Sequence, residues 1–132
     1  MPHIIIDYSA NLEGPADIGG LCEVMRCAAA ALDAFPMTGV RVRAIRADHY
    51  AIADGDPEYG YIDISVRLRQ GRAQAVKEAA TAVLFAAARN HLAEVIAARP
   101  MLLSLEMRDI DARLSPKLNT VRKRIESGAK ND

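Results

Sequence analysis

The sequence predicts an α+β fold in which two βαβ units form one four-stranded mixed sheet with helices on one face. Two segments alternate apolar and polar side chains, as half-buried strands do, and each leads into a longer stretch with helical periodicity. A further strand-like run follows each helical stretch, so that the order strand, helix, strand occurs twice, at residues 2–46 and 61–108. The 132 residues, 51% of them hydrophobic, suit one domain, residues 1–132.

The first unit starts with an apolar strand at residues 2–8, which leads into a turn-rich stretch at residues 9–15. Asp17 follows as an N-cap residue, because its carboxylate can accept a hydrogen bond from the first turn of a helix. Apolar side chains continue at helical spacing, and we expect this helix to end at about Ala34. Pro36 stops it, since proline cannot continue the hydrogen-bond ladder.

The strand after this helix, at residues 40–45, alternates between apolar residues and arginines. Alternation places successive side chains on opposite faces of a sheet. Arg41 and Arg43 therefore share the face that points away from the helix. The connection that follows, at residues 47–60, contains the turn signal Asp54-Gly55 and predicts a hairpin-like link.

The second unit opens with a clean alternation at residues 61–68. A turn at Gly71-Arg72 leads into a helix that we expect to span residues 73–98, and a fourth strand follows at residues 102–107. The predicted apolar stripe of this helix consists of Val76, Ala80, Val83, Leu84, Ala87, Leu92, Val95 and Ile96.

Two features of the predicted fold favour assembly with other copies. The sheet face opposite the helices has no part of the chain left to cover it, and open strand edges favour pairing. Residues 109–132 form a short extension that is available to add a strand to a neighbour, with a turn near Pro116 and a polar tail from Ser127 that we expect to be mobile. The charged and polar residues of the uncovered face are Arg41, Arg43, Asp63, Ser65 and Arg67.

The charge balance restricts the classes of partner. Seventeen basic and 17 acidic residues give no net charge, which argues against nucleic acid and anionic membranes as partners. With no apolar stretch long enough to span a membrane and no signal peptide pattern, we expect a cytoplasmic protein. Cys22 and Cys27 are expected to be reduced core thiols, and His3, His49 and His91 lack the spacing of metal ligands.

Pro2 directly follows Met1, and this position allows two interpretations. In one, Pro2 is simply tolerated at the start of a strand, because its missing N–H costs no ladder bond there. In the other, removal of Met1 leaves a secondary amine that can act as a general base. With Met1 in place, the Pro2 nitrogen belongs to an amide whose lone pair is delocalised, and it cannot accept a proton.

Five short pieces occur in order along the chain: Pro2-His3, residues 35–43 (Phe-Pro-Met-Thr-Gly-Val-Arg-Val-Arg), Ala53-Asp54-Gly55, Gly71-Arg72, and residues 103–106 (Leu-Ser-Leu-Glu). In these pieces and in its doubled βαβ plan, the chain resembles the tautomerase superfamily, whose members use the N-terminal proline as a base. Up to about Val121 it is similar to the 5-carboxymethyl-2-hydroxymuconate delta-isomerase family. The resemblance implies a homotrimer in which three sheets pack their helix-free faces into an inner barrel, with sites near the subunit boundaries.

The resemblance also implies a reaction, with Pro2 as the catalytic base. Isomerases of this family move a proton along the conjugated system of an unsaturated 2-hydroxy acid from aromatic-compound catabolism, the degradation of homoprotocatechuate, and need no metal or cofactor. A single amine can take a proton at one position and return it at another if the amine is neutral at working pH. Burial lowers the pKa of an amine, and a guanidinium at about 6 Å lowers it by about two further units.

Arg41 and Arg72 are implied as the residues that bind the substrate's carboxylates. Arg41 lies at the family's Val-Arg-Val strand position, and Arg72 lies at the turn before the second helix, where free N–H groups also favour anions. Without the resemblance, each is interpreted as a solvated surface arginine. Arg43 is expected to be structural or to lie between subunits, and Glu106 to be a buried partner of an arginine.

Two alternatives to this small-acid isomerase are left open by the sequence. One is another tautomerase-superfamily enzyme that acts on a different 2-oxo acid, such as a phenylpyruvate-type tautomerase. The other is a trimeric binding or signalling protein that keeps the fold without the chemistry. Loops around residues 47–60 and neighbouring subunits are expected to shape the pocket, so the sequence does not select one substrate.

Overall fold

The central feature of the computed structural model, which describes residues 2–128, is a four-stranded sheet with the strand order β2-β1-β3-β4. The strands are β1 (His3–Ser9), β2 (Arg41–Ala47), β3 (Gly60–Arg69) and β4 (Met101–Ile110). β1 is parallel to β2 and antiparallel to β3, and β3 is parallel to β4. The prediction of a mixed four-stranded sheet is therefore confirmed.

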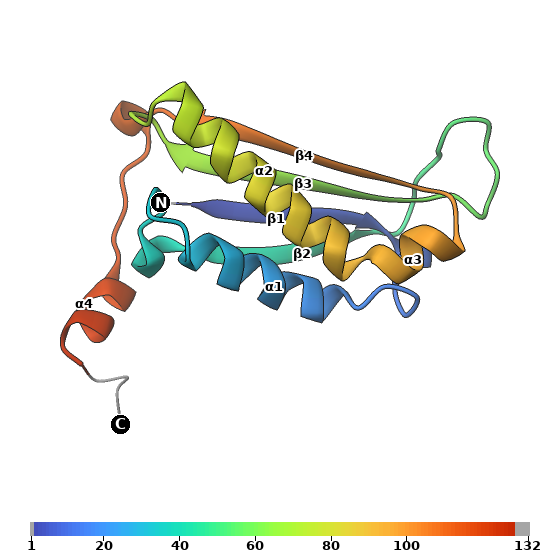
Figure 1. Cartoon of the computed structure of the whole chain (residues 1–132), viewed down its shortest axis with the longest axis horizontal. Coiled ribbons are helices and arrows are strands. Elements are labelled where there is room, and N and C mark those ends of the chain that lie inside the picture. The colour runs from blue at the N-terminus through green and yellow to red at the C-terminus, as the bar shows by residue number, and fades with distance from the viewer. Residues whose placement is uncertain (1, 129–132) are drawn as a thin grey trace.

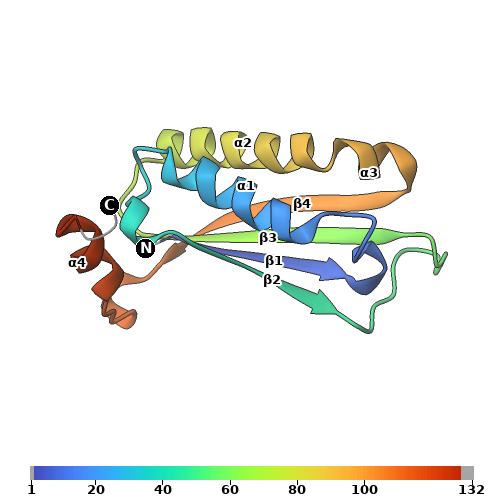
Figure 2. The same cartoon turned by 90° about the horizontal axis from the view of Figure 1, so that it is seen from below.

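Each parallel strand pair is joined by a helical crossover, as the two predicted βαβ units require. α1 (Ile18–Ala30) connects β1 to β2, after a short 3-10 turn, η1 (Ala10–Leu12). α2 (Gln74–His91) and α3 (Ala93–Ala98) connect β3 to β4. Figures 1 and 2 show these helices on one face of the sheet, while the other face is bare.

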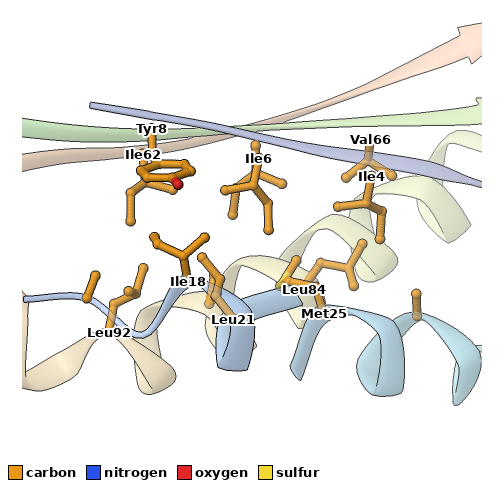
Figure 3. Packing of buried hydrophobic residues seen from close by; sticks show 14 of the residues in the cluster. Ile4, Ile6, Tyr8, Ile18, Leu21, Met25, Ile62, Val66, Leu84 and Leu92 are labelled. Atoms are coloured by element: carbon orange, nitrogen blue, oxygen red, sulfur yellow. The ribbon is translucent and has the colours of Figure 1, made fainter. Parts of the chain in front are cut away.

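The core fills the space between the sheet and the two long helices. In Figure 3, Ile4 and Ile6 point from β1 toward Leu21 and Met25 of α1, and all four side chains are fully buried. Burying an aliphatic side chain of this size is worth about 1.5–3 kcal/mol. The alternating residues of β3 complete the floor of this core: Ile62, Ile64, Val66 and Leu68.

The first helix begins as predicted but ends earlier. The Asp17 carboxylate accepts a hydrogen bond from the Gly20 N–H at 2.9 Å, which is the predicted N-cap. α1 ends at Ala30 rather than at about Ala34, because the chain turns to bring Phe35, which is 3% exposed, down onto the core. Its N–H donates to the Leu32 carbonyl at 3.0 Å in that turn.

The second predicted helix is divided, and its buried stripe is narrower than predicted. The break lies at Leu92, which stays buried between α2 and α3. Val76, Val83 and Ile96 were expected in the stripe but are 42%, 46% and 37% exposed. A helix that contacts the sheet along one side buries only the residues of that side, which here are Ala80, Leu84, Ala88, Leu92 and Val95.

The predicted hairpin-like link between β2 and β3 is wrong, because β1 lies between these two strands. Residues 48–59 instead pass around the end of β1 as a long loop, which Figure 1 shows projecting from one end of the sheet. The predicted turn inside this loop is present. Gly55 has a φ of 90°, and its N–H donates to the Ile52 carbonyl at 2.8 Å.

The extension after β4 forms no additional strand within the described residues. It contains a 3-10 turn, η3 (Ala112–Leu114), and α4 (Thr120–Glu126). The Asn119 carboxamide caps α4 and also donates to the Thr38 carbonyl at 3.0 Å, so the helix is docked on η2 (Met37–Gly39). Of the tail expected to be mobile, residues 129–132 lie outside the described residues. No helix within residues 2–128 has the length and apolar character needed to cross a membrane.

Candidate active site

A pocket of about 390 Å³ lies at the end of the sheet where β1 and β2 begin and β3 and β4 end. Strand register explains its floor, because His3 pairs with Arg41 on one side and with Arg67 on the other. These side chains lie on the helix-free face of three neighbouring strands. Arg69 and residues 115–118 of the extension form the surrounding walls.

Pro2 and Arg41, two of the three predicted site residues, are brought together at this end of the sheet. Pro2 is buried directly before His3, and its carbonyl accepts the Arg41 N–H at 3.3 Å. The Arg41 side chain lines the pocket, where its Nε donates to the Gly39 carbonyl at 3.4 Å. Met1 lies outside the described residues, and Pro2 itself is not among the residues that line the pocket.

Arg72, the third predicted residue, lies beside this pocket rather than in its lining. Gly71, with a φ of 120°, turns the chain from β3 toward α2. The Arg72 guanidinium then donates to the carbonyls of Arg69 at 2.9 Å and of Ala34 at 3.2 Å. These two hydrogen bonds tie the turn to the segment that follows α1. The Arg72 charge still acts on the pocket wall, because desolvation and then the charges of Arg69, Arg122 and Arg72 lower the pKa of Lys117.

The pocket is strongly electropositive, and the titration of its side chains reflects this. Burial, followed by the charges of Arg41, Arg67 and Arg43, lowers the pKa of His3 from 6.5 to about 4, so His3 is neutral at pH 7. No carboxylate among residues 2–128 lines the pocket. The Arg67 Nε is buried without a hydrogen-bond partner in the described part of the chain. A buried guanidinium N–H without an acceptor favours binding of an anion.

Other candidates do not form a comparable site. A larger hollow of about 680 Å³ lies between α2 and β4, but it contains none of the three predicted site residues and combines Lys77 with the carboxylates of Glu78, Glu106 and Asp109. The expectation that Glu106 is buried is wrong, because it lies on the open face of an edge strand and pairs with Arg108 at 3.5 Å.

The remaining predicted residues are spread over the surface. Arg43 is exposed on the helix-free face of the sheet. Cys22 packs partly against the core, whereas Cys27 is exposed, so the prediction of two core thiols holds only for Cys22. His49 is exposed, and the imidazole of His91 contacts the Asp17 carbonyl at 3.0 Å.

Sequence reasoning missed Arg69 and Lys117 as pocket residues. Arg69 continues the alternation that places Arg67 on the helix-free face, and this pattern was sufficient to find it. Lys117 had no such signal, since it comes from an extension whose path depends on how α4 docks.

The fold defines the class of protein. A solved structure described as a fused 4-OT symmetric trimer is 20% identical, with a TM-score of 0.60 over 89% of this chain and 94% of its own. That likeness shows the tautomerase fold.

Two more similar relatives define the family. Residues 2–125 match the family model of 5-carboxymethyl-2-hydroxymuconate isomerase. The 5-carboxymethyl-2-hydroxymuconate Delta-isomerase of Escherichia coli is 31% identical over 121 residues, 92% of this chain and 96% of its own. A crystal structure of a 5-carboxymethyl-2-hydroxymuconate isomerase from Deinococcus radiodurans R1 is 31% identical, with a TM-score of 0.86 over 94% of this chain and 93% of its own. The chain belongs to the 5-carboxymethyl-2-hydroxymuconate isomerase family and is an isomerase.

Removing the Arg41 charge should raise the pKa of His3, because that charge opposes the imidazolium. We expect the His3 ring resonances of Arg41→Met to titrate above pH 4 in an NMR pH series, while those of Arg46→Met, at the far end of β2, titrate as in the unsubstituted chain. The pKa of His3 is lower in the folded chain than its value of 6.5 in the unfolded chain. The contribution of the neutral ring to the stability of the fold is therefore present above pH 6.5 and is lost as the pH falls toward 4. An unchanged His3 titration in Arg41→Met would contradict this account of the pocket.

Proposed function

We propose that this isomerase moves a proton within 5-carboxymethyl-2-hydroxymuconate and converts the dienol acid into its keto isomer, in the cytoplasmic degradation of homoprotocatechuate. One observation carries the proposal. The pocket lined by His3, the residue after Pro2, gathers Arg41, Arg67 and Arg69, and no carboxylate of residues 2–128 lines it. A site with this charge suits a small molecule with several carboxylates, and the names of the relatives specify one such molecule.

Pro2 acts as the general base in this proposal, once Met1 has been removed. The Pro2 nitrogen then becomes a secondary amine at the buried start of β1. The burial and the arginine charges that lower the pKa of the adjacent His3 act in the same direction on an amine, since both disfavour its protonated form. A neutral amine can take the proton from one carbon or oxygen of the conjugated system and return it at another.

Arg41 and Arg72 bind and polarise the substrate in this proposal. The Arg41 Nε is engaged only by a long contact to the Gly39 carbonyl, which leaves its terminal N–H groups for a carboxylate. Arg72 gives its Nε and Nη1 donors to backbone carbonyls, and in this proposal its remaining donors bind a carboxylate. A guanidinium near the 2-oxygen stabilises negative charge that develops there during proton transfer.

The active form in this proposal is a homotrimer. The helix-free face carries exposed apolar side chains among its charges, including Ile45 at 53% and Leu102 at 60% exposure. Removing such side chains from water stabilises an assembly by about 25 cal/mol for each Å² of apolar surface. No part of residues 2–128 covers the helix-free face, and packing against other copies of the chain would cover it.

The decisive experiment for Pro2 compares two preparations of the same chain, one free of Met1 and one that retains it, each verified by intact mass. We expect only the Met-free chain to convert 5-carboxymethyl-2-hydroxymuconate in an ultraviolet absorbance assay, because the retained Met1 keeps the nitrogen in an amide. Both preparations should show the same circular dichroism spectrum. Undiminished turnover by the wholly Met-retaining chain would refute the proline mechanism.

The two arginines should contribute to transition-state stabilisation. We expect Arg41→Ala and Arg72→Ala each to lower kcat/KM by about 10- to 150-fold, the range for hydrogen bonds to charged groups. Arg72→Ala should also lower the Tm, since two backbone carbonyls lose their donor. Arg46→Ala, on the same strand as Arg41 and paired with Asp48, is the control and should change kcat/KM less than threefold. Losses below threefold in both test variants would make them ordinary surface arginines.

The trimer should form through the helix-free face of the sheet. Light scattering should give a mass of three times 14.3 kDa at micromolar concentration. Ser65→Asp places a charge on the bare face and should shift the protein toward monomer, since an unpaired charge is costly to bury. Ala79→Asp adds the same charge to the exposed side of α2 and should leave the mass unchanged. A monomeric unsubstituted chain would contradict the proposal.

A further inference from the structure

The C-terminal segment, residues 111–126, crosses the end of the sheet at the pocket. It leaves β4 at one edge of the sheet and reaches α4 near the start of β2 at the other edge, as Figure 1 shows. Two hydrogen bonds fasten it to Thr38, which lies just before β2. The Asn119 carboxamide donates to the Thr38 carbonyl at 3.0 Å, and the Arg122 Nε donates to the Thr38 hydroxyl at 3.3 Å.

This anchored segment places Lys117 in the lining of the same pocket as Arg41, Arg67 and Arg69 of the sheet. Partial desolvation, followed by the charges of Arg69, Arg122 and Arg72, lowers the pKa of Lys117. Lys117 forms no ion pair within residues 2–128, and neither do Arg67 and Arg69. The fold therefore holds an ammonium group and guanidinium groups in one pocket, and no carboxylate from the described part of the chain lines that pocket to balance them.

The positive groups of the pocket are divided between two sides. Arg41 and Arg67 belong to its floor, which the sheet provides, and the buried Arg67 Nε has no acceptor there. Lys117 belongs to the wall that the C-terminal segment provides. A ligand with carboxylates on its main chain and another on a branch can meet both sides at once.

We propose that Lys117 is a specificity-determining residue, which binds the third carboxylate of a tricarboxylic acid and so selects such acids over dicarboxylic ones. The inference rests on the proposed function, in which the substrate bears a carboxymethyl branch on a dicarboxylic chain. A lysine supplies a compact, mobile charge, which suits a carboxylate on a flexible branch better than the planar fork of an arginine.

The test uses two unreactive probes that differ by one carboxylate, tricarballylate and glutarate, with affinities measured by titration calorimetry. We expect the unsubstituted chain to bind tricarballylate at least tenfold more tightly than glutarate. Lys117→Met should weaken tricarballylate binding about tenfold and change glutarate binding less than threefold. The expected loss lies at the lower end of the range for hydrogen bonds to charged groups, because Lys117 is exposed. Lys117→Arg should retain most of the selectivity.

Lys123→Met is the matched control, since Lys123 is an exposed lysine of α4 outside the pocket lining. It should leave both affinities unchanged. The proposal would be overturned if Lys117→Met weakened the binding of both probes equally, or if Lys123→Met weakened tricarballylate binding as much as Lys117→Met does. It would also be overturned if the unsubstituted chain showed no preference for tricarballylate. Because binding is measured without turnover, the expected selectivity supports the role of Lys117 even if the chain does not convert 5-carboxymethyl-2-hydroxymuconate. Failure to convert that acid would count only against the proposed reaction.

Discussion

The pairing of β1 with two neighbours is the constraint on which the rest of the structure depends. Because β2 and β3 flank β1, its backbone groups are bonded on both sides, and the apolar residues of one face form the centre of the core. The same register places His3 between Arg41 and Arg67. A shift of either pairing by one residue would send these side chains to the opposite face and dismantle core and pocket together.

The concentration of positive charge at one end of the sheet is a local feature of a chain with no net charge. The acidic residues of the open face lie elsewhere along the strands, where Asp7 accepts a hydrogen bond from Tyr61 and Asp63 from Ser104. Like charges repel, so the cluster at the pocket lowers the stability of the empty protein. Binding of an anion relieves that repulsion, which is the thermodynamic link between the electrostatics of this fold and small carboxylic acids.

The C-terminal segment adds a wall to the end of the sheet, which becomes a pocket. Thr38 connects two functions in this arrangement, since it anchors α4 and lies three residues before Arg41. The position of Lys117 is thereby coupled to the strand that carries Arg41. The segment is polar and short, and its stability derives from the cap at Asn119 and from docking rather than from a core of its own.

The sequence by itself determined the two βαβ units, the N-cap at Asp17 and the faces of the alternating strands, because side-chain periodicity and capping are local properties. It also indicated Pro2, Arg41 and Arg72 through resemblance. The place of β1 between β2 and β3, the break at Leu92 and the docking of α4 were decided by the tertiary structure, since each depends on packing between distant segments. For the same reason only the fold showed that Lys117 lines the same pocket as Arg69, because no local pattern relates an extension to the strand end that it covers.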